Sequence, residues 1–90
     1  LVHPKGVAVN PDTHLVYVTG RDNDRLYVVD SFTFTVLQSV KVGQEPWGVA
    51  VNPATNKVYV ANFASGNVYV LDATTRVILD VIYVGPNPTF

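Results

Sequence analysis

An internal repeat constrains the fold of this chain more than any other feature of its sequence. The stretch "PKGVAVNPDTHLVYVTG", which begins at Pro4, returns as "PWGVAVNPATNKVYVAN", which begins at Pro46, and the two align without a gap. The match continues through "LYVVD" and "VYVLD" to Gly43 and Gly85, and Pro88 stands where a third copy would begin. A repeat of about 40–45 residues is typical of propeller blades and of helical solenoids.

The contents of the repeat favour strands over helices. Each copy has four short apolar runs, rich in valine, isoleucine, tyrosine and threonine, which fit a pleated sheet. None of the runs has the three-four spacing of a helix. Asn-Pro pairs, and the aspartates Asp30 and Asp72, supply turn chemistry between them. The expected strands cover residues 6–10, 15–19, 25–30, 36–42, 48–52, 58–61, 67–72 and 77–84.

The expected strands are apolar on both faces, as "GVAVN" and "LVYV" illustrate. A sheet of this kind must be covered on both sides. With no helix to cover it, other sheets must do so, as they do around the axis of a β-propeller. A single β-sandwich is the alternative, but it would need polar outer faces, and only "VLQSVKV" provides one. We therefore predict an all-β fold of two four-stranded antiparallel propeller blades, with "GVAV" innermost and "VLQSVKV" at the outer edge.

The motifs that recur also carry a family resemblance. "VAVNP", "VYVTG" and "VYVAN", "LYVVD" and "VYVLD", and "VKVG" and "VYVG" resemble the YVTN family of β-propeller repeats. That family includes surface-layer-type proteins and secreted or periplasmic propellers. The resemblance implies a first blade over residues 1–43, a second over 44–85 and the start of a further repeat at 86–90. It also implies a cell-surface, extracellular or periplasmic location.

Two blades alone would leave apolar faces uncovered, and exposed apolar patches usually mark an interaction surface. The expected partners are therefore other propeller blades, either in a longer parent protein or in a homo-oligomer that closes a ring. About two to four identical chains would close a propeller of about 4 to 8 blades. A protein or carbohydrate ligand is a further candidate partner. A net charge of −1 makes nucleic acid an unfavourable partner, and no apolar run is long enough to span a membrane.

No catalytic set is evident in the sequence. The chain has no cysteine, which excludes thiol catalysis and thiolate metal sites. The two histidines, His3 and His14, lack acidic neighbours at metal-binding spacing, and solvated loop positions explain them best. The run "RDNDR" departs from a calcium loop, because Tyr27 and Thr33 occupy the sixth and twelfth positions from Asp22. We therefore expect no catalytic residue, no metal and no cofactor.

Trp47 is the strongest candidate for ligand contact, because it precedes the innermost strand of the second repeat. A loop at this point of a propeller borders the mouth of the central channel, where an aromatic ring can stack on a ligand. Packing against the neighbouring blade is the favoured alternative. The polar residues expected near Trp47 are Lys5, Arg21, Arg25 and Glu45.

The sequence thus predicts a non-catalytic propeller module with a structural or protein-interaction role. A second class stays open. It comprises a propeller that binds a small ligand or single-stranded nucleic acid, and a lyase-type propeller enzyme whose active residues lie on other blades.

Overall fold

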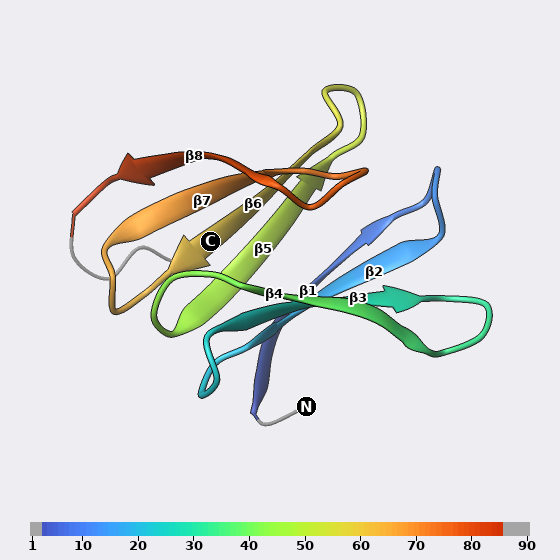
Figure 1. The fold of residues 1–90 in the computed structure, drawn as a ribbon, viewed down its shortest axis with the longest axis horizontal. Coiled ribbons are helices and arrows are strands. Elements are labelled where there is room, and N and C mark those ends of the chain that lie inside the picture. The colour runs from blue at the N-terminus through green and yellow to red at the C-terminus, as the bar shows by residue number, and fades with distance from the viewer. Residues whose placement is uncertain (1–2, 86–90) are drawn as a thin grey trace.

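The computed structural model describes residues 3–85, which form two four-stranded antiparallel sheets (Figure 1). Each sheet follows the order of the sequence, so every strand pairs with its neighbour along the chain. The described residues contain strands, turns and connecting segments, and no helix among them could cross a membrane. The first sheet contains β1 Pro4–Asn10, β2 Leu15–Gly20, β3 Arg25–Asp30 and β4 Val36–Lys41. The second contains β5 Pro46–Asn52, β6 Lys57–Asn62, β7 Asn67–Asp72 and β8 Ile78–Tyr83.

The turns between the third and fourth strands of each sheet are held by an aspartate. Asp30 Oδ1 accepts hydrogen bonds from the backbone N–H groups of Phe32, at 2.7 Å, and Thr33, at 3.0 Å. Asp72 makes the same two bonds in the second sheet. These backbone donors hold the pKa of both carboxyl groups below its ordinary value, because they stabilise the charged form. The turn function expected from the sequence is confirmed at both positions.

The two faces of each sheet have different side chains. The strand registers place Val7, Val9, Val16 and Val18 on one side of the first sheet, and we call this side the valine face. They place Ala8, Tyr17 and Val28 on the other side, the alanine face. The second sheet repeats the arrangement. Its valine face contains Val49, Val51, Val58 and Val60, and its alanine face contains Ala50, Tyr59 and Val70.

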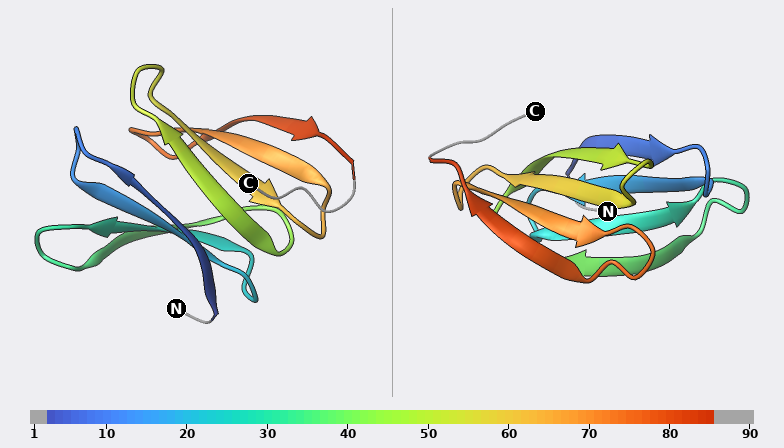
Figure 2. Two further views of the ribbon diagram at one scale, coloured as in Figure 1. Left: turned by 180° about the vertical axis from the view of Figure 1, so that it is seen from behind. Right: turned by 90° about the horizontal axis from the view of Figure 1, so that it is seen from above.

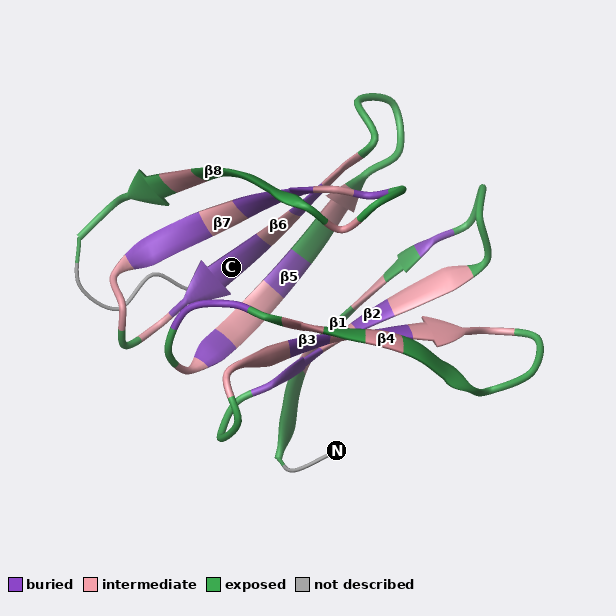
Figure 3. Ribbon diagram, viewed as in Figure 1, coloured by how far each residue is buried: buried purple, intermediate pink, exposed green. Residues whose placement is uncertain are grey.

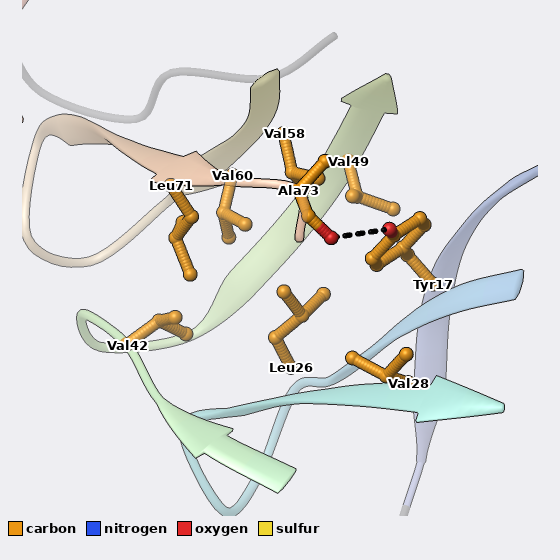
Figure 4. Close-up of a cluster of buried hydrophobic side chains, with 9 residues drawn as sticks. All are labelled: Tyr17, Leu26, Val28, Val42, Val49, Val58, Val60, Leu71 and Ala73. Atoms are coloured by element: carbon orange, nitrogen blue, oxygen red, sulfur yellow. Dashed lines mark hydrogen bonds between the residues drawn. The ribbon is translucent and has the colours of Figure 1, made fainter. Parts of the chain in front are cut away.

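The core lies between the alanine face of the first sheet and the valine face of the second (Figure 4). Tyr17, Leu26 and Val28 come from the first sheet, and Val58, Val60 and Leu71 from the second. All six are fully buried, and Val42, Val49 and Ala73 complete the cluster. Figure 4 also shows the Tyr17 hydroxyl donating a hydrogen bond to the carbonyl of Ala73, at 3.4 Å. Burial raises the pKa of this hydroxyl, and the nearby Arg76 charge opposes the shift.

The sheets come closest at their first strands, where β1 lies against β5. A Cβ atom on Gly6 would lie only 2.3 Å from the carbonyl oxygen of Trp47, so this approach requires glycine. Thr19 joins the two strands, because its Oγ1 accepts from the Gly6 N–H at 2.8 Å and donates to the Trp47 carbonyl at 3.2 Å. The innermost position expected for "GVAV" is therefore present.

Much of the remaining surface is open to solvent (Figure 3), although Ala61, Val68 and Val70 are buried on the alanine face of the second sheet. Val7 is 67% exposed and Val9 56% exposed on the valine face of the first sheet. The outermost strands β4 and β8 are mostly exposed, as expected for the outer edge. The two four-stranded antiparallel sheets confirm the predicted all-β fold. The expected start of a further repeat at 86–90 lies outside the described residues.

Candidate functional site

Four strand ends meet at one end of the molecule and bring together most of the residues singled out from the sequence. Pro4, where β1 begins, pairs with Gly20, where β2 ends. Pro46 and Asn62 make the equivalent pair in the second sheet. Because β1 lies against β5, the side chains beside these four residues form one group, which we call the strand-end cluster. Its members are His3, Lys5, Arg21, Asp22, Glu45, Trp47 and Phe63.

The aromatic part of the strand-end cluster is a stacked pair with a cation above it. The Trp47 and Phe63 rings are nearly parallel, with their centroids 4.2 Å apart and 14° between their planes. The Lys5 ammonium lies 4.5 Å from the centroid of the Trp47 ring, within the range of a cation–π interaction. Since Lys5 belongs to β1 and Trp47 to β5, this cation–π contact also joins the two sheets. Trp47 thus stacks on a residue of its own sheet, and the Lys5 ammonium is its contact from the neighbouring sheet.

The polar part of the strand-end cluster is a chain of charged groups. The Arg21 Nε atom lies 3.6 Å from a Glu45 carboxylate oxygen and 3.7 Å from one of Asp22. Asp22 also pairs with the Nδ1 atom of His3. All four side chains are substantially exposed to solvent, so these ion pairs contribute little to stability. They do hold a guanidinium and an imidazole beside the aromatic pair.

Two buried polar atoms at this end have no hydrogen-bond partner within residues 3–85. They are the indole Nε1 of Trp47 and the amide Oδ1 of Asn62. The amide nitrogen of Asn62 donates to Asn67 at 2.9 Å, so only its oxygen is unsatisfied. A buried donor or acceptor without a partner is unfavourable by about 1–3 kcal/mol, which makes such atoms natural contacts for a ligand or a neighbouring chain.

Arg25 is placed differently from the other candidates. It begins β3 and lies opposite Gly20 and Lys41, near the outer part of the first sheet. Its guanidinium donates to the Ser39 hydroxyl at 3.5 Å. The structure therefore brings Trp47, Lys5, Arg21 and Glu45 together and associates Arg25 with β4.

Sequence reasoning missed four residues at this end, namely His3, Asp22, Asn62 and Phe63. His3 was interpreted as a solvated loop residue, and Phe63 was not singled out. The repeat contained the signal, because His3, Lys5 and Arg21 occupy the positions of Glu45, Trp47 and Phe63. His3 and Glu45 even share a positive φ, of 48° and 49°. Core residues agree between the copies at most positions, whereas these three pairs all differ in chemistry.

Over residues 3–85, no three histidine, aspartate or glutamate side chains come together as a metal-ion site would require. His14, at the opposite end, lies against the Phe32 ring with 4.4 Å between centroids. His3 is therefore the histidine of the strand-end cluster.

The sequence over residues 2–86 matches the cytochrome D1 heme domain family. The chain belongs to this family. No curated protein sequence matches it. The family and the solved structures similar to this chain are β-propeller proteins, in agreement with the fold predicted from the repeat. The match names this family and not the YVTN repeat family that the motifs resemble.

Three solved structures illustrate the likeness. Hydrazine synthase from Kuenenia stuttgartiensis has a TM-score of 0.90 and 28% identity, over 98% of this chain and 25% of that one. Apo AztD from Citrobacter koseri has a TM-score of 0.82 and 28% identity, over 97% and 25%. The dihydro-heme d1 dehydrogenase NirN, solved in complex with DHE, has a TM-score of 0.71 and 32% identity, over 88% and 16%. This chain thus spans a quarter or less of each of these structures.

These comparisons correct one expectation. The sequence predicted a protein that is not an enzyme, because no catalytic set is evident in the 90 residues. That prediction is wrong, since the family and two of the similar structures, a synthase and a dehydrogenase, are enzyme-related propeller proteins.

Proposed function

We propose that the chain supplies two adjacent blades, residues 1–43 and 44–85, of a larger β-propeller in which the strand-end cluster contributes to a heme-class ligand site. Residues 86–90 would begin the next blade. The observation that carries this proposal is the Trp47–Phe63 stack, with a cation over it and a buried indole N–H that lacks a partner.

The residues of the strand-end cluster fit a flat, anionic macrocycle. A heme combines a large aromatic surface with carboxylate groups, and an aromatic pair beside two cations suits both features. Lys5 and Arg21 would hold the carboxylates, while Trp47 and Phe63 would shape the apolar side. The unsatisfied Trp47 N–H and Asn62 oxygen would orient polar groups at the rim of the ligand.

His3 adds a ligand atom suited to iron. Histidine is a common axial ligand of heme iron, and a ligating imidazole usually pairs its other nitrogen with a carboxylate. The His3 Nδ1 atom is paired with Asp22, which leaves Nε2 as the nitrogen for a metal. Asp22 would then fix the ring orientation and raise the basicity of the ligand. Bound heme would supply the redox chemistry of its iron, and other blades would complete the site.

An extracellular or periplasmic setting belongs to the same proposal. Such a location fits the family, and the YVTN-like motifs support it independently. A role in a surface layer is supported by the YVTN-like motifs alone.

Hemin titration of the chain tests the ligand site, because Trp47 is its single tryptophan and its fluorescence reports on this position. We expect saturable quenching and a Soret shift, both weakened several-fold by Lys5→Gln and by Arg21→Gln. Lys41→Gln, at an exposed lysine on β4, is the matched control and should bind as the wild type does. Equal quenching in all four proteins would show non-specific adsorption and would refute the assignment.

A further inference from the structure

Asp24 lies in the turn between β2 and β3, and its backbone has a conformation that favours glycine. Its φ is 57°, in the left-handed region, and the second copy of the repeat has Gly66 at the equivalent position, with a φ of 70°. Aspartate tolerates this region better than most residues but less well than glycine, because its Cβ lies too close to a carbonyl oxygen. The backbone of the turn therefore does not explain why the first copy has an aspartate there.

The backbone of this turn makes the same contact in both copies. The carbonyl of Asp24 accepts a hydrogen bond from the Val42 N–H at 2.9 Å, and the carbonyl of Gly66 accepts one from the Val84 N–H at 3.1 Å. Glycine thus suffices to bind the turn to the residue that follows the outermost strand of each sheet. An aspartate side chain is not needed for this contact.

The Asp24 carboxylate binds the segment that connects the two sheets, residues 42–45. Its Oδ1 atom accepts a hydrogen bond from the Glu45 N–H at 3.0 Å. Glu45 also has a left-handed backbone, with a φ of 49°, so this bond holds a second residue in an unfavourable conformation. Asp24 is half-buried, and a bond from a charged acceptor in such a place is stronger than one fully open to water.

Glu45 in turn contacts both parts of the strand-end cluster. Its carbonyl accepts a hydrogen bond from the Phe63 N–H at 2.9 Å, and the Phe63 ring is the one stacked on Trp47. Its carboxylate lies 3.6 Å from the Arg21 Nε atom. The position of Glu45 therefore affects both the aromatic stack and the guanidinium.

We infer that Asp24 is a positioning residue for the strand-end cluster. It acts through Glu45, because its carboxylate holds the Glu45 backbone, and Glu45 sets the positions of Arg21 and of the Trp47–Phe63 stack. All of these groups lie between residues 21 and 63, so the arrangement does not depend on the neighbours of the outer sheet faces. Its consequence for ligand binding rests on the proposed function, whereas its consequence for the aromatic stack does not.

Amide hydrogen exchange measures the bond directly. We expect the Glu45 N–H to be protected in the wild-type chain and in Asp24→Asn, because an asparagine oxygen accepts the same bond and asparagine also tolerates a positive φ. Its exchange should be about tenfold faster in Asp24→Gly, where the acceptor is lost. Gly66 shows that glycine fits this turn, so the variant should fold. A wild-type Glu45 N–H without protection would overturn the inference before any variant is made.

Tryptophan fluorescence reports whether the bond acts on the aromatic stack, because Trp47 is the single tryptophan of the chain. We expect Asp24→Gly to shift the emission to longer wavelength and to raise quenching by acrylamide, while Asp24→Asn leaves both unchanged. Asp12→Gly is the matched control, because it makes the same exchange in the exposed turn between β1 and β2, at the opposite end of the strands. Thermal melts accompany the spectra, since a purely structural role for Asp24 would change stability without changing the emission of Trp47.

Hemin titration extends the test to the ligand. Asp24→Gly should bind hemin several-fold more weakly than the wild type, while Asp24→Asn and Asp12→Gly should bind as the wild type does. A wild-type chain without saturable binding would refute the heme site, and exchange and fluorescence would still decide the role of Asp24. Wild-type exchange and emission in Asp24→Gly would overturn that role, and so would an equal change in Asp24→Asn or Asp12→Gly.

Discussion

The two sheets have nearly the same sequence and very different exposure. Val7 is 67% exposed in the first sheet, while its equivalent Val49 in the second is 9% exposed. The tyrosines show the reverse, because Tyr17 is fully buried and its equivalent Tyr59 is half-buried. The residue type cannot explain these differences. Position in the stack explains them, since Val49 and Tyr17 lie on the two faces that pack against each other, whereas Val7 and Tyr59 lie on the faces that point away (Figure 2).

The comparison separates two kinds of position in the repeat. Most face positions are the same or stay apolar in both copies, because packing against a neighbouring sheet requires them. Strand-end positions differ, and Lys5 facing Trp47 is the clearest case. Agreement between the copies therefore identifies the core, and disagreement at one end identifies the candidate site.

The largest expected difference in the free energy of unfolding is between two equivalent valines, Val49 in the core and Val7 on the open face. Val49→Ala removes two carbon atoms from the core and should lower the free energy of unfolding by about 1.5 kcal/mol or more. Val7→Ala makes the same change on the open face and should alter it by less than about 0.5 kcal/mol. Chemical denaturation at a concentration where the chain is monomeric measures both. Equal losses would mean that the valine face of the first sheet is covered in solution.

The fold could be predicted from the sequence because it depends on the apolar strand residues that recur in both copies of the repeat. Two strands, Arg25–Asp30 and Asn67–Asp72, have the bounds expected from the sequence, and the others differ by one or two residues at one or both ends. The expected first strands began two residues late, since Pro4 and Pro46 were assigned to loops and in fact begin β1 and β5. Proline is tolerated there because it is the first residue of an edge strand, whose other side pairs with no strand of its own sheet.

The site could be predicted only in part. Trp47, Lys5, Arg21, Arg25 and Glu45 were expected near the loop that enters the innermost strand. The structure brings four of them together and places Arg25 beside β4. Phe63 was missed because its partner in the stack is 16 residues away in sequence, at the far end of a paired strand. Such proximity follows from sheet register, which hydrophobic patterning alone does not reveal.

A smaller effect is expected at the tyrosine pair. Tyr17→Phe removes the hydrogen bond to the Ala73 carbonyl and should lower the free energy of unfolding by about 0.5–1 kcal/mol, because the bond is buried but long. Tyr59→Phe, at the equivalent position of the open face, is the control and should be close to neutral.

The same pair predicts a dependence on alkaline pH. The pKa of Tyr17 is raised in the folded state, so the stabilisation from its neutral form is complete below the unfolded value of about 10 and is lost as pH rises through the folded pKa. Tyr17→Phe should therefore flatten the loss of stability above about pH 10, whereas Tyr59→Phe should leave the wild-type profile. Thermal melts between pH 8 and 11 would distinguish the two, and identical profiles for both variants would contradict the burial of Tyr17.

The smallest expected loss of stability comes from the turn aspartates, and it should be equal in the two sheets. Asp30 and Asp72 bind the backbone of their own turns, so their contribution does not depend on which face is covered. Asp30→Ala and Asp72→Ala should each lower the melting temperature by a few degrees at neutral pH, and by the same amount within error.

Both carboxyl groups have a lowered pKa, so their stabilisation is present above the unfolded value of about 3.9 and is lost as pH falls through the folded pKa. Each variant should accordingly lose less stability than the wild type on acidification below about pH 4, and melts at pH 2–7 measure it. A large difference between the two variants would show that these turns are coupled to the stacking of the sheets, and the separation between local turns and face-dependent core would then fail.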